Sequence, residues 1–446
     1  MPKNLVTIKD LHVGRIRGLA ATYQGEDGLP LLLSGGEDRN LNMSDALSGD
    51  FVRKVPAFTG RPGHQGHRDK IYAIQLWTSK EDGVTYIVST GDDLLIRIFN
   101  MEDCKGVRTM GGHSQYVHSL IILQEESRCV SASYDRSIRL WDLLAGEQLR
   151  KFSQSKVLYA IDWLMDAPTN TVFATGFAEK VHVWDVGTAT VLNILEEGAP
   201  VGADDNSLTS SVEGAVVEGG GGDGGGEGAT NDPFSALLEE GGRVVRPRDT
   251  LPQYVKIELR SHIRTVTAIA FPRSDRLISA SDDATICVWN PEDEHCPLLE
   301  KINAKTPIYS MKVWDDGTAF LLVTASWGKP FSVKIWNMEA KEKPSDDSES
   351  EEELESDEEP EPKEMTYLYA LDVGLGHTEN VVNLAILDDG KPHVVKEKRK
   401  ADEEVDTKRV ASISFDGTIR TWDLRPAIEI IHRAKFLEAA QTSRTF

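Results

Sequence analysis

Histidine, aspartate and tryptophan recur along this chain at a regular spacing, and such groups could act in catalysis or form a hydrogen-bonded support. In each clear copy an aspartate precedes a tryptophan or its counterpart by six residues, as in Asp135 and Trp141. A half-buried carboxylate needs hydrogen-bond donors, and the ring N–H groups of histidine and tryptophan supply them. Because the pattern recurs with each structural repeat, we assign it to stability rather than catalysis. The predicted structural residues are His67, His113, His262, His377, Asp93, Asp135, Asp283, Trp141 and Trp289.

These aspartates lie in repeated segments whose alternating apolar residues predict two strands around a turn. The clearest copies are SASYDRSIRLWD at 131–142, SASDDATICVWN at 279–290 and SISFDGTIRTWD at 412–423. A period in the forties with a Trp-Asp ending is typical of propeller blades. The weaker copies lie at residues 34–45, 89–100, 174–185 and 324–337.

The segments resemble the repeats of the WD-repeat family, whose β-propeller blades bury a hydrogen-bonded set of His, Ser or Thr, Asp and Trp. The resemblance implies an all-β, seven-bladed β-propeller over residues 4–425, with residues 4–8 completing the last blade. The first copy departs from the pattern at Ser44, and the fourth and sixth depart at Ala178 and Gly328. The expected blades lie near residues 11–50, 67–105, 113–152, 157–196, 262–300, 306–340 and 377–425.

Three insertions interrupt the repeats. Residues 197–253 are glycine-rich and predict a flexible loop, and residues 388–408 form a charged loop. Residues 338–365 predict a disordered acidic loop, since eleven of the sixteen side chains at 346–361 are acidic. This loop serves either solubility or phosphorylation, because some of its serines precede an acidic residue by three positions. The predicted phosphorylation sites are Ser348, Ser350 and Ser356.

The segment after the last repeat, residues 426–446, predicts a tail with a short helix. Its apolar residues recur at roughly helical spacing and could form one face. Packing on the last blade is the expected role, and binding of a partner is the alternative. The residues of this face are Ile428, Ile431, Phe436 and Leu437.

Composition excludes several classes of function. The net charge of −23 disfavours general nucleic-acid binding, because phosphates would be repelled. No apolar run is long enough to span a membrane, and we expect a cytoplasmic or nuclear protein. We expect no metal, cofactor or small-molecule substrate, because His64 and His67 lack a third ligand and no phosphate-binding loop follows the glycine run. The cysteines, which form no C-x-x-C pair, are Cys104, Cys129, Cys287 and Cys296.

The residue before each turn aspartate is the best candidate for partner binding. The resemblance places this position on the rim of the propeller's narrow face, where it would present three carboxylates and four aromatic rings. That mixture suits a basic or amphipathic peptide, although turn positions are often polar or aromatic without binding anything. The predicted rim residues are Glu37, Asp92, Tyr134, Phe177, Asp282, Trp327 and Phe415.

Three functions remain open at this stage. We expect a non-catalytic scaffold or adaptor in a multiprotein complex, because seven repeats occur without a reactive constellation. A less favoured role is a nuclear, nucleolar or chromatin-related assembly factor. The alternative is a substrate receptor of a cullin-type ubiquitin ligase, from a resemblance to its docking box at Asp416, Trp422, Asp423 and Arg425.

Overall fold

The computed structural model describes most of the repeated segments and one C-terminal helix. The described residues are 4–24, 29–60, 65–153, 158–163, 171–176, 180–185, 259–273, 276–290, 298–315, 317, 319–329, 331–338, 369–370, 376–387 and 408–442. They belong to one compact unit formed by residues 1–192 and 256–446. The glycine-rich insertion, Phe177 and the three predicted phosphorylation sites lie outside the described residues, as do almost all of the acidic and charged loops.

The strands pair in antiparallel four-stranded sheets, numbered here along the chain. Sheet one contains β2 (Ile16–Gln24), β3 (Leu29–Gly36), β4 (Leu41–Asp45) and β5 (Phe51–Val55). Sheet two contains β6 (Ile71–Thr78), β7 (Thr85–Gly91), β8 (Leu95–Asn100) and β9 (Gly106–Gly111). Sheet three contains β10 (Val117–Leu123), β11 (Arg128–Ser133), β12 (Ser137–Asp142) and β13 (Gln148–Ser153), with a 3₁₀ turn at Gln124–Glu126.

The remaining sheets follow the same order of strands. Sheet four contains β14 (Leu158–Trp163), β15 (Thr171–Gly176), β16 (Lys180–Asp185) and β17 (Leu259–Arg260). Sheet five contains β18 (Val266–Arg273), β19 (Arg276–Ser281), β20 (Thr285–Trp289) and β21 (Leu298–Asn303). Sheet six contains β22 (Ile308–Asp315), β23 (Phe320–Ser326), β24 (Val333–Asn337) and β25 (Tyr369–Ala370). Sheet seven contains β26 (Val381–Ile386), β27 (Arg409–Ser414), β28 (Ile419–Asp423) and β1 (Asn4–Ile8).

The first strand of each sheet contacts the first strand of the next, and β26 contacts β2. This is the arrangement of a β-propeller, so the expected all-β propeller fold with a C-terminal helix is confirmed. Six of the sheets can be followed with their packed side chains. Sheet four is described by its backbone alone, and its place as a blade therefore rests on strand pairing.

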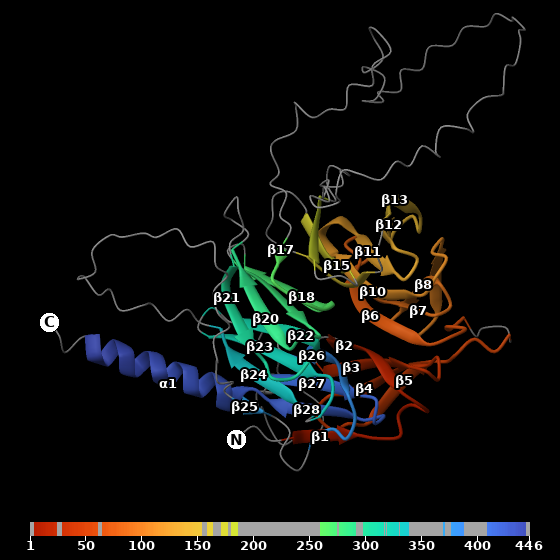
Figure 1. Ribbon diagram of the computed structural model, residues 1–446. Helices are drawn as coiled ribbons and strands as arrows, with labels where there is room; N and C mark the ends of the chain where they lie inside the picture. Colours follow the sequence, from red (N-terminus) through yellow and green to blue (C-terminus); the bar gives the residue numbers. More distant parts are fainter. Residues whose placement is uncertain are drawn as a thin grey trace, which may run out of the picture. The chain divides into compact units, whose positions relative to one another are not determined.

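The two ends of the chain share sheet seven. Strand β1 pairs with β28, with Ile8 opposite Ile419, and Figure 1 shows the two strands side by side. This pairing covers the outer edge of β28, which would otherwise present unpaired backbone groups.

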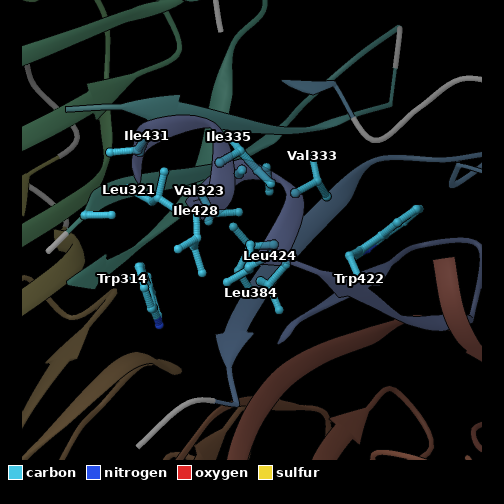
Figure 2. Close-up of a cluster of buried hydrophobic side chains, with 14 of the residues drawn as sticks. Trp314, Leu321, Val323, Val333, Ile335, Leu384, Trp422, Leu424, Ile428 and Ile431 are labelled. Carbon is cyan, nitrogen blue, oxygen red and sulfur yellow. The ribbon is translucent and has the colours of Figure 1, made fainter. Parts of the chain in front are cut away.

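The C-terminal helix α1 (Arg425–Thr442) packs against two sheets rather than against the last one alone. Its Ile428 and Ile431 are buried beside Leu321 of sheet six and Leu384 of sheet seven, as Figure 2 shows. The predicted apolar face was wrong for Phe436, which is 74% exposed. The helix is therefore anchored through its first turns, while Phe436 projects away from the core.

Candidate partner-binding face

The turn aspartate of sheet three is held by a buried hydrogen-bonded chain. The Nδ1 atom of His113 lies 2.8 Å from an Asp135 carboxylate oxygen, and its Nε2 atom lies 2.8 Å from the Ser131 hydroxyl. Trp141 Nε1 donates to the same hydroxyl at 2.8 Å. A neutral imidazole that donates from Nδ1 and accepts at Nε2 satisfies every member of this chain. The set supports the turn and leaves no side chain exposed to act on a substrate.

Equivalent sets occur in sheets two, five and seven. Each has a histidine between a turn aspartate and a serine of the second strand, and sheets five and seven keep the tryptophan donor. Sheet two has Phe99 in place of the tryptophan, so its serine has one donor fewer. The sets are His67, Asp93 and Ser89; His262, Asp283, Ser279 and Trp289; and His377, Asp416, Ser412 and Trp422.

Sheet one contains a further set that the sequence patterns missed. His12 Nδ1 lies 2.9 Å from Asp38, and its Nε2 lies 2.8 Å from Ser34. His12 was not among the predicted residues, although it stands 26 residues before its aspartate, as His67 does. The counterpart of the tryptophan is Ser44, whose buried hydroxyl has no hydrogen-bond partner among the described residues.

The hydrogen bonds keep the turn aspartates ionised. Burial raises the pKa of Asp135, but hydrogen bonds from Ser137, His113 and the Ser114 amide outweigh it and lower the pKa to about 2. The same balance, with His67 as the first donor, lowers the pKa of Asp93 to about 2. Each carboxylate thus acts as a fixed acceptor that orders its turn.

The residues before these aspartates occupy one equivalent position. In each described turn, the backbone N–H of the rim residue donates to a carbonyl just before the first strand of the same sheet, at 2.8 to 3.0 Å. Trp327 keeps this bond despite its longer turn, donating to the Pro307 carbonyl at 2.8 Å. All the described rim side chains are half-buried. They are Glu37, Asp92, Tyr134, Asp282, Trp327 and Phe415.

The aromatic rim residues form two groups together with side chains from the innermost strands. Trp327 stacks on Tyr309 with ring centroids 4.9 Å apart and meets Phe415 edge-on at 5.6 Å. Tyr134 stacks on Tyr116 at 4.5 Å, and Tyr116 lies 5.6 Å from Tyr72. The tyrosines of the innermost strands were missed because we examined only the turns. Tyr72 and Tyr309 directly follow the first apolar residue of their innermost strands, and Tyr116 directly precedes that of its strand. This shared position at the start of the strand could have identified them.

Two arginines lie between the aromatic groups. The Arg17 guanidinium is 5.0 Å from the Phe415 centroid and 5.2 Å from that of Tyr72, so it contacts both groups. Arg15 lies 4.6 Å from the Phe415 centroid. Cation–π attraction stabilises such contacts. Rim and inner-strand side chains from sheets six, seven, one, two and three therefore form a continuous surface.

The rim carboxylates have basic neighbours within the chain. Glu37 accepts a hydrogen bond from Arg17 at 3.0 Å, and Asp92 lies 3.7 Å from the Lys70 ammonium group. Burial raises the pKa of Asp282, and the charge of Arg264 opposes that rise. The acidic character expected of the rim is therefore largely offset locally.

A cavity of about 570 Å³ opens between the innermost strands. Its described lining is polar where Arg17, Tyr72, His118, Tyr309 and Asn383 meet. Within the described residues, no three His, Cys, Asp or Glu side chains are grouped as a metal site would require. No helix in the described part of the chain is long and apolar enough to cross a membrane.

Three residues of the predicted ligase-docking box, Trp422, Asp423 and Arg425, lie at the junction of β28 and α1, and Asp416 lies in the turn between β27 and β28. Asp423 accepts hydrogen bonds from the Arg425 guanidinium at 2.5 to 3.0 Å and from its backbone N–H at 3.0 Å. Trp422 is buried, and Asp416 is held by His377. These contacts give Trp422, Asp423 and Arg425 roles in ordering the junction and give Asp416 a role in ordering the turn.

Known proteins share the repeat. The family model described as "WD domain, G-beta repeat" matches residues 104–142 and 253–290. The U3 small nucleolar RNA-associated protein 15 homolog of Xenopus tropicalis is 27% identical over 202 residues, which cover 45% of this chain and 34% of the relative. Pre-mRNA-processing factor 17 of Mus musculus is 26% identical over 131 residues, covering 27% and 23%. Small ribosomal subunit protein RACK1 of Caenorhabditis elegans is 26% identical over 120 residues, covering 27% and 35%.

The matches thus span only about a quarter to a third of the length of these relatives. The similarity lies in the repeats. They agree with the recurring buried sets of His, Ser, Asp and Trp and with the propeller arrangement of the sheets. The chain therefore contains WD-type repeats, and its sheets are arranged as in a β-propeller.

Proposed function

We propose that the protein is a non-catalytic scaffold whose rim binds another protein. In this proposal residues 4–425 form one seven-bladed propeller, from which the loops at 197–253, 338–365 and 388–408 leave. The observation that carries it is the half-buried aromatic surface that joins Trp327 and Phe415 to Tyr72 and Tyr134 through Arg17. Aromatic residues and arginine are the side chains most enriched at protein interfaces.

The buried His–Asp sets support the choice of a scaffold over an enzyme. Each histidine of these sets has both ring nitrogens engaged within its sheet, as His113 does with Asp135 and Ser131. Such a residue orders a turn and cannot also transfer a proton to a bound substrate.

Affinity purification of the full chain with quantitative mass spectrometry tests the scaffold. We expect Trp327→Ala to reduce recovery of the principal partner at least about fivefold, because interface aromatics contribute on the order of 1–2 kcal/mol or more. Phe51→Ala is the matched control, since Phe51 is an exposed aromatic on the outer strand β5. Equal recovery with Trp327→Ala and Phe51→Ala would reject the rim as the binding surface. Thermal unfolding of both variants separates loss of binding from loss of fold, and Tyr134→Ala provides a second rim variant.

A second candidate is a scaffold within a ribonucleoprotein assembly in the nucleus or cytoplasm. The names of the relatives refer to U3 small nucleolar RNA, pre-mRNA processing and the small ribosomal subunit. Sedimentation of the cellular complex before and after RNase treatment tests this role. A particle whose size and composition are unchanged by RNase would exclude it and leave the general scaffold intact.

The ligase-receptor hypothesis has less support. The Arg425 guanidinium is already hydrogen-bonded to Asp423, and no relative named above carries a ligase description. Co-purification of a cullin adaptor that Arg425→Ala abolishes would revive it.

A further inference from the structure

The entrance of the central cavity carries more positive charge than the rim sequence indicates. Arg17 of β2 lines the cavity, and Arg15 lies immediately before this strand. Both guanidinium groups lie against Phe415, at 4.6 Å for Arg15 and 5.0 Å for Arg17. The Glu37 carboxylate faces both cations, and Asp92 lies close enough to Arg17 for their charges to interact.

The aromatic faces at this entrance are already occupied by cations of the chain itself. Phe415 is covered by Arg15 and Arg17, and Tyr72 by Arg17. A lysine or arginine from a partner would have to displace these groups and would meet like charge. The geometry therefore disfavours the basic peptide that the carboxylates of the rim suggest.

The arginines retain capacity for a further acceptor. A guanidinium group has five N–H donors, and Glu37 accepts from one nitrogen of Arg17 at 3.0 Å. The Nε–H of Arg17 is buried and has no hydrogen-bond partner among the described residues, so a further acceptor would approach the terminal nitrogens of this partly exposed side chain. Arg15 is exposed beside it. A second carboxylate placed between the two side chains would gain charge-assisted hydrogen bonds.

We propose that this entrance, formed by Arg15, Arg17, Tyr72, Tyr309 and Phe415, binds one carboxylate side chain of the protein partner. The inference rests on the proposed scaffold function and specifies the chemistry of the partner. The half-buried ring of Tyr309 offers apolar contact to the stem of an Asp or Glu side chain or to an adjacent apolar residue.

A peptide fits this entrance better than a nucleic acid. The positive charge is confined to one point, and Glu37, Asp92 and Asp282 stand along the same rim. An extended phosphate backbone would lie over these carboxylates, and the net charge of −23 would repel it. A peptide that places a single carboxylate at this point avoids the first cost and limits the repulsion by the net charge to that of one group.

Selection from a random peptide library on the immobilised full chain tests the proposal. We expect the recovered peptides to be enriched in Asp and Glu, and the best of them, labelled with a fluorophore, to bind at least about tenfold more weakly to Arg15→Gln/Arg17→Gln. Arg15→Gln alone should weaken binding in the same direction and, being a change at an exposed side chain, should leave the fold intact. Lys54→Gln is the control, because it removes an exposed positive charge from β5 of the same sheet.

Three results would overturn the proposal: enrichment of basic peptides, acidic peptides that bind Arg15→Gln/Arg17→Gln as tightly as wild type, or displacement of the labelled peptide by single-stranded RNA at equal concentration. These outcomes differ from failure of the scaffold itself. If Trp327→Ala still abolishes binding of the cellular partner while Arg15→Gln does not, the rim remains the proposed binding surface. Only the proposed recognition of a carboxylate is then rejected.

Discussion

The ammonium group of Lys334 lies 2.6 Å from the backbone carbonyl oxygen of Ala304 and 3.1 Å from the hydroxyl of Thr306. Ala304 stands four residues before Ile308 of β22, the place that His262 takes before Val266 in sheet five. Lys334 is almost fully buried. In sheet six, therefore, a lysine of the third strand holds the segment before the first strand in place. In sheets five and seven a histidine has this role.

Lys334→Met should destabilise the fold by about 1–3 kcal/mol, because it leaves the buried Ala304 carbonyl without that donor while keeping most of the apolar stem. Chemical denaturation monitored by tryptophan fluorescence measures the change. Lys312→Met is the matched control, since Lys312 is exposed on β22 of the same sheet. An equal loss of stability in both variants would show that Lys334 has no special role.

Trp141→Phe should cost about 1–2 kcal/mol of unfolding free energy. The substitution removes the Nε1–H donor to Ser131 and some buried volume, while sheet two tolerates Phe99 at the equivalent position. A double-mutant cycle with Ser131→Ala, measured by urea denaturation, isolates the hydrogen bond. We expect the two losses to be less than additive, and strict additivity would contradict the bond.

His113 and His262 should affect stability in opposite directions as pH changes. Burial lowers the pKa of His113, and nearby Arg139 adds to that effect against the attraction of Asp135. Its neutral form is therefore the stabilising one: its contribution is complete above the unfolded pKa of about 6.5 and is lost as pH falls below it.

Sheet five has Cys287 where sheet three has Arg139. Burial also opposes the charged form of His262, but hydrogen bonds with Asp283 and Cys287 outweigh it and raise the pKa to about 9. Its contribution is complete below about 6.5 and is lost as pH rises towards 9.

The thermal midpoints of wild type, His113→Gln and His262→Gln between about pH 5.5 and 8.5 test this contrast. The difference between wild type and His113→Gln should widen as pH rises, and that for His262→Gln should narrow. Parallel pH profiles for the two variants would show that Arg139 and Cys287 do not set the charge of these histidines.

The anchoring of α1 predicts a sharp contrast along one helix. Ile428→Ala or Ile431→Ala should destabilise the fold by about 2–4 kcal/mol, because each leaves a cavity between sheets six and seven. Phe436→Ala should change stability by less than about 0.5 kcal/mol, because its side chain is 74% exposed. Equilibrium unfolding of the three variants measures both effects. A large loss for Phe436→Ala would place that side chain in a contact absent from the structure.

Much of the fold could be predicted because each repeat carries its own signals. Asp135 precedes a turn, alternating residues flank it, and Trp141 marks the end of the third strand. The sequence also showed that Ser44 and Gly328 depart from the Trp and Asp positions of the repeat. It did not show which contacts take the place of the missing hydrogen bonds. In sheet six, Lys334 of the third strand contacts the segment that a histidine occupies in other sheets. Lys334 and Ala304 are thirty residues apart, and no local sequence pattern links them.

The candidate site could be predicted only in part. The equivalent positions of Trp327 and Phe415 follow from the repeat, and the structure places both on one rim. The side chains that surround Trp327 and Phe415 do not follow from the repeat. Arg15 and Arg17 reach Phe415 only because sheet seven lies against sheet one, joining residues four hundred positions apart in the chain.

The sequence by itself determined the resemblance to WD repeats, most of the strands and four of the buried sets, because hydrogen bonds within one blade depend on residues spaced regularly along the chain. Tertiary structure alone decided which charge the rim presents and where α1 is anchored. Both depend on contacts between blades, and the attraction between two side chains depends on their distance in space, which spacing along the chain does not record.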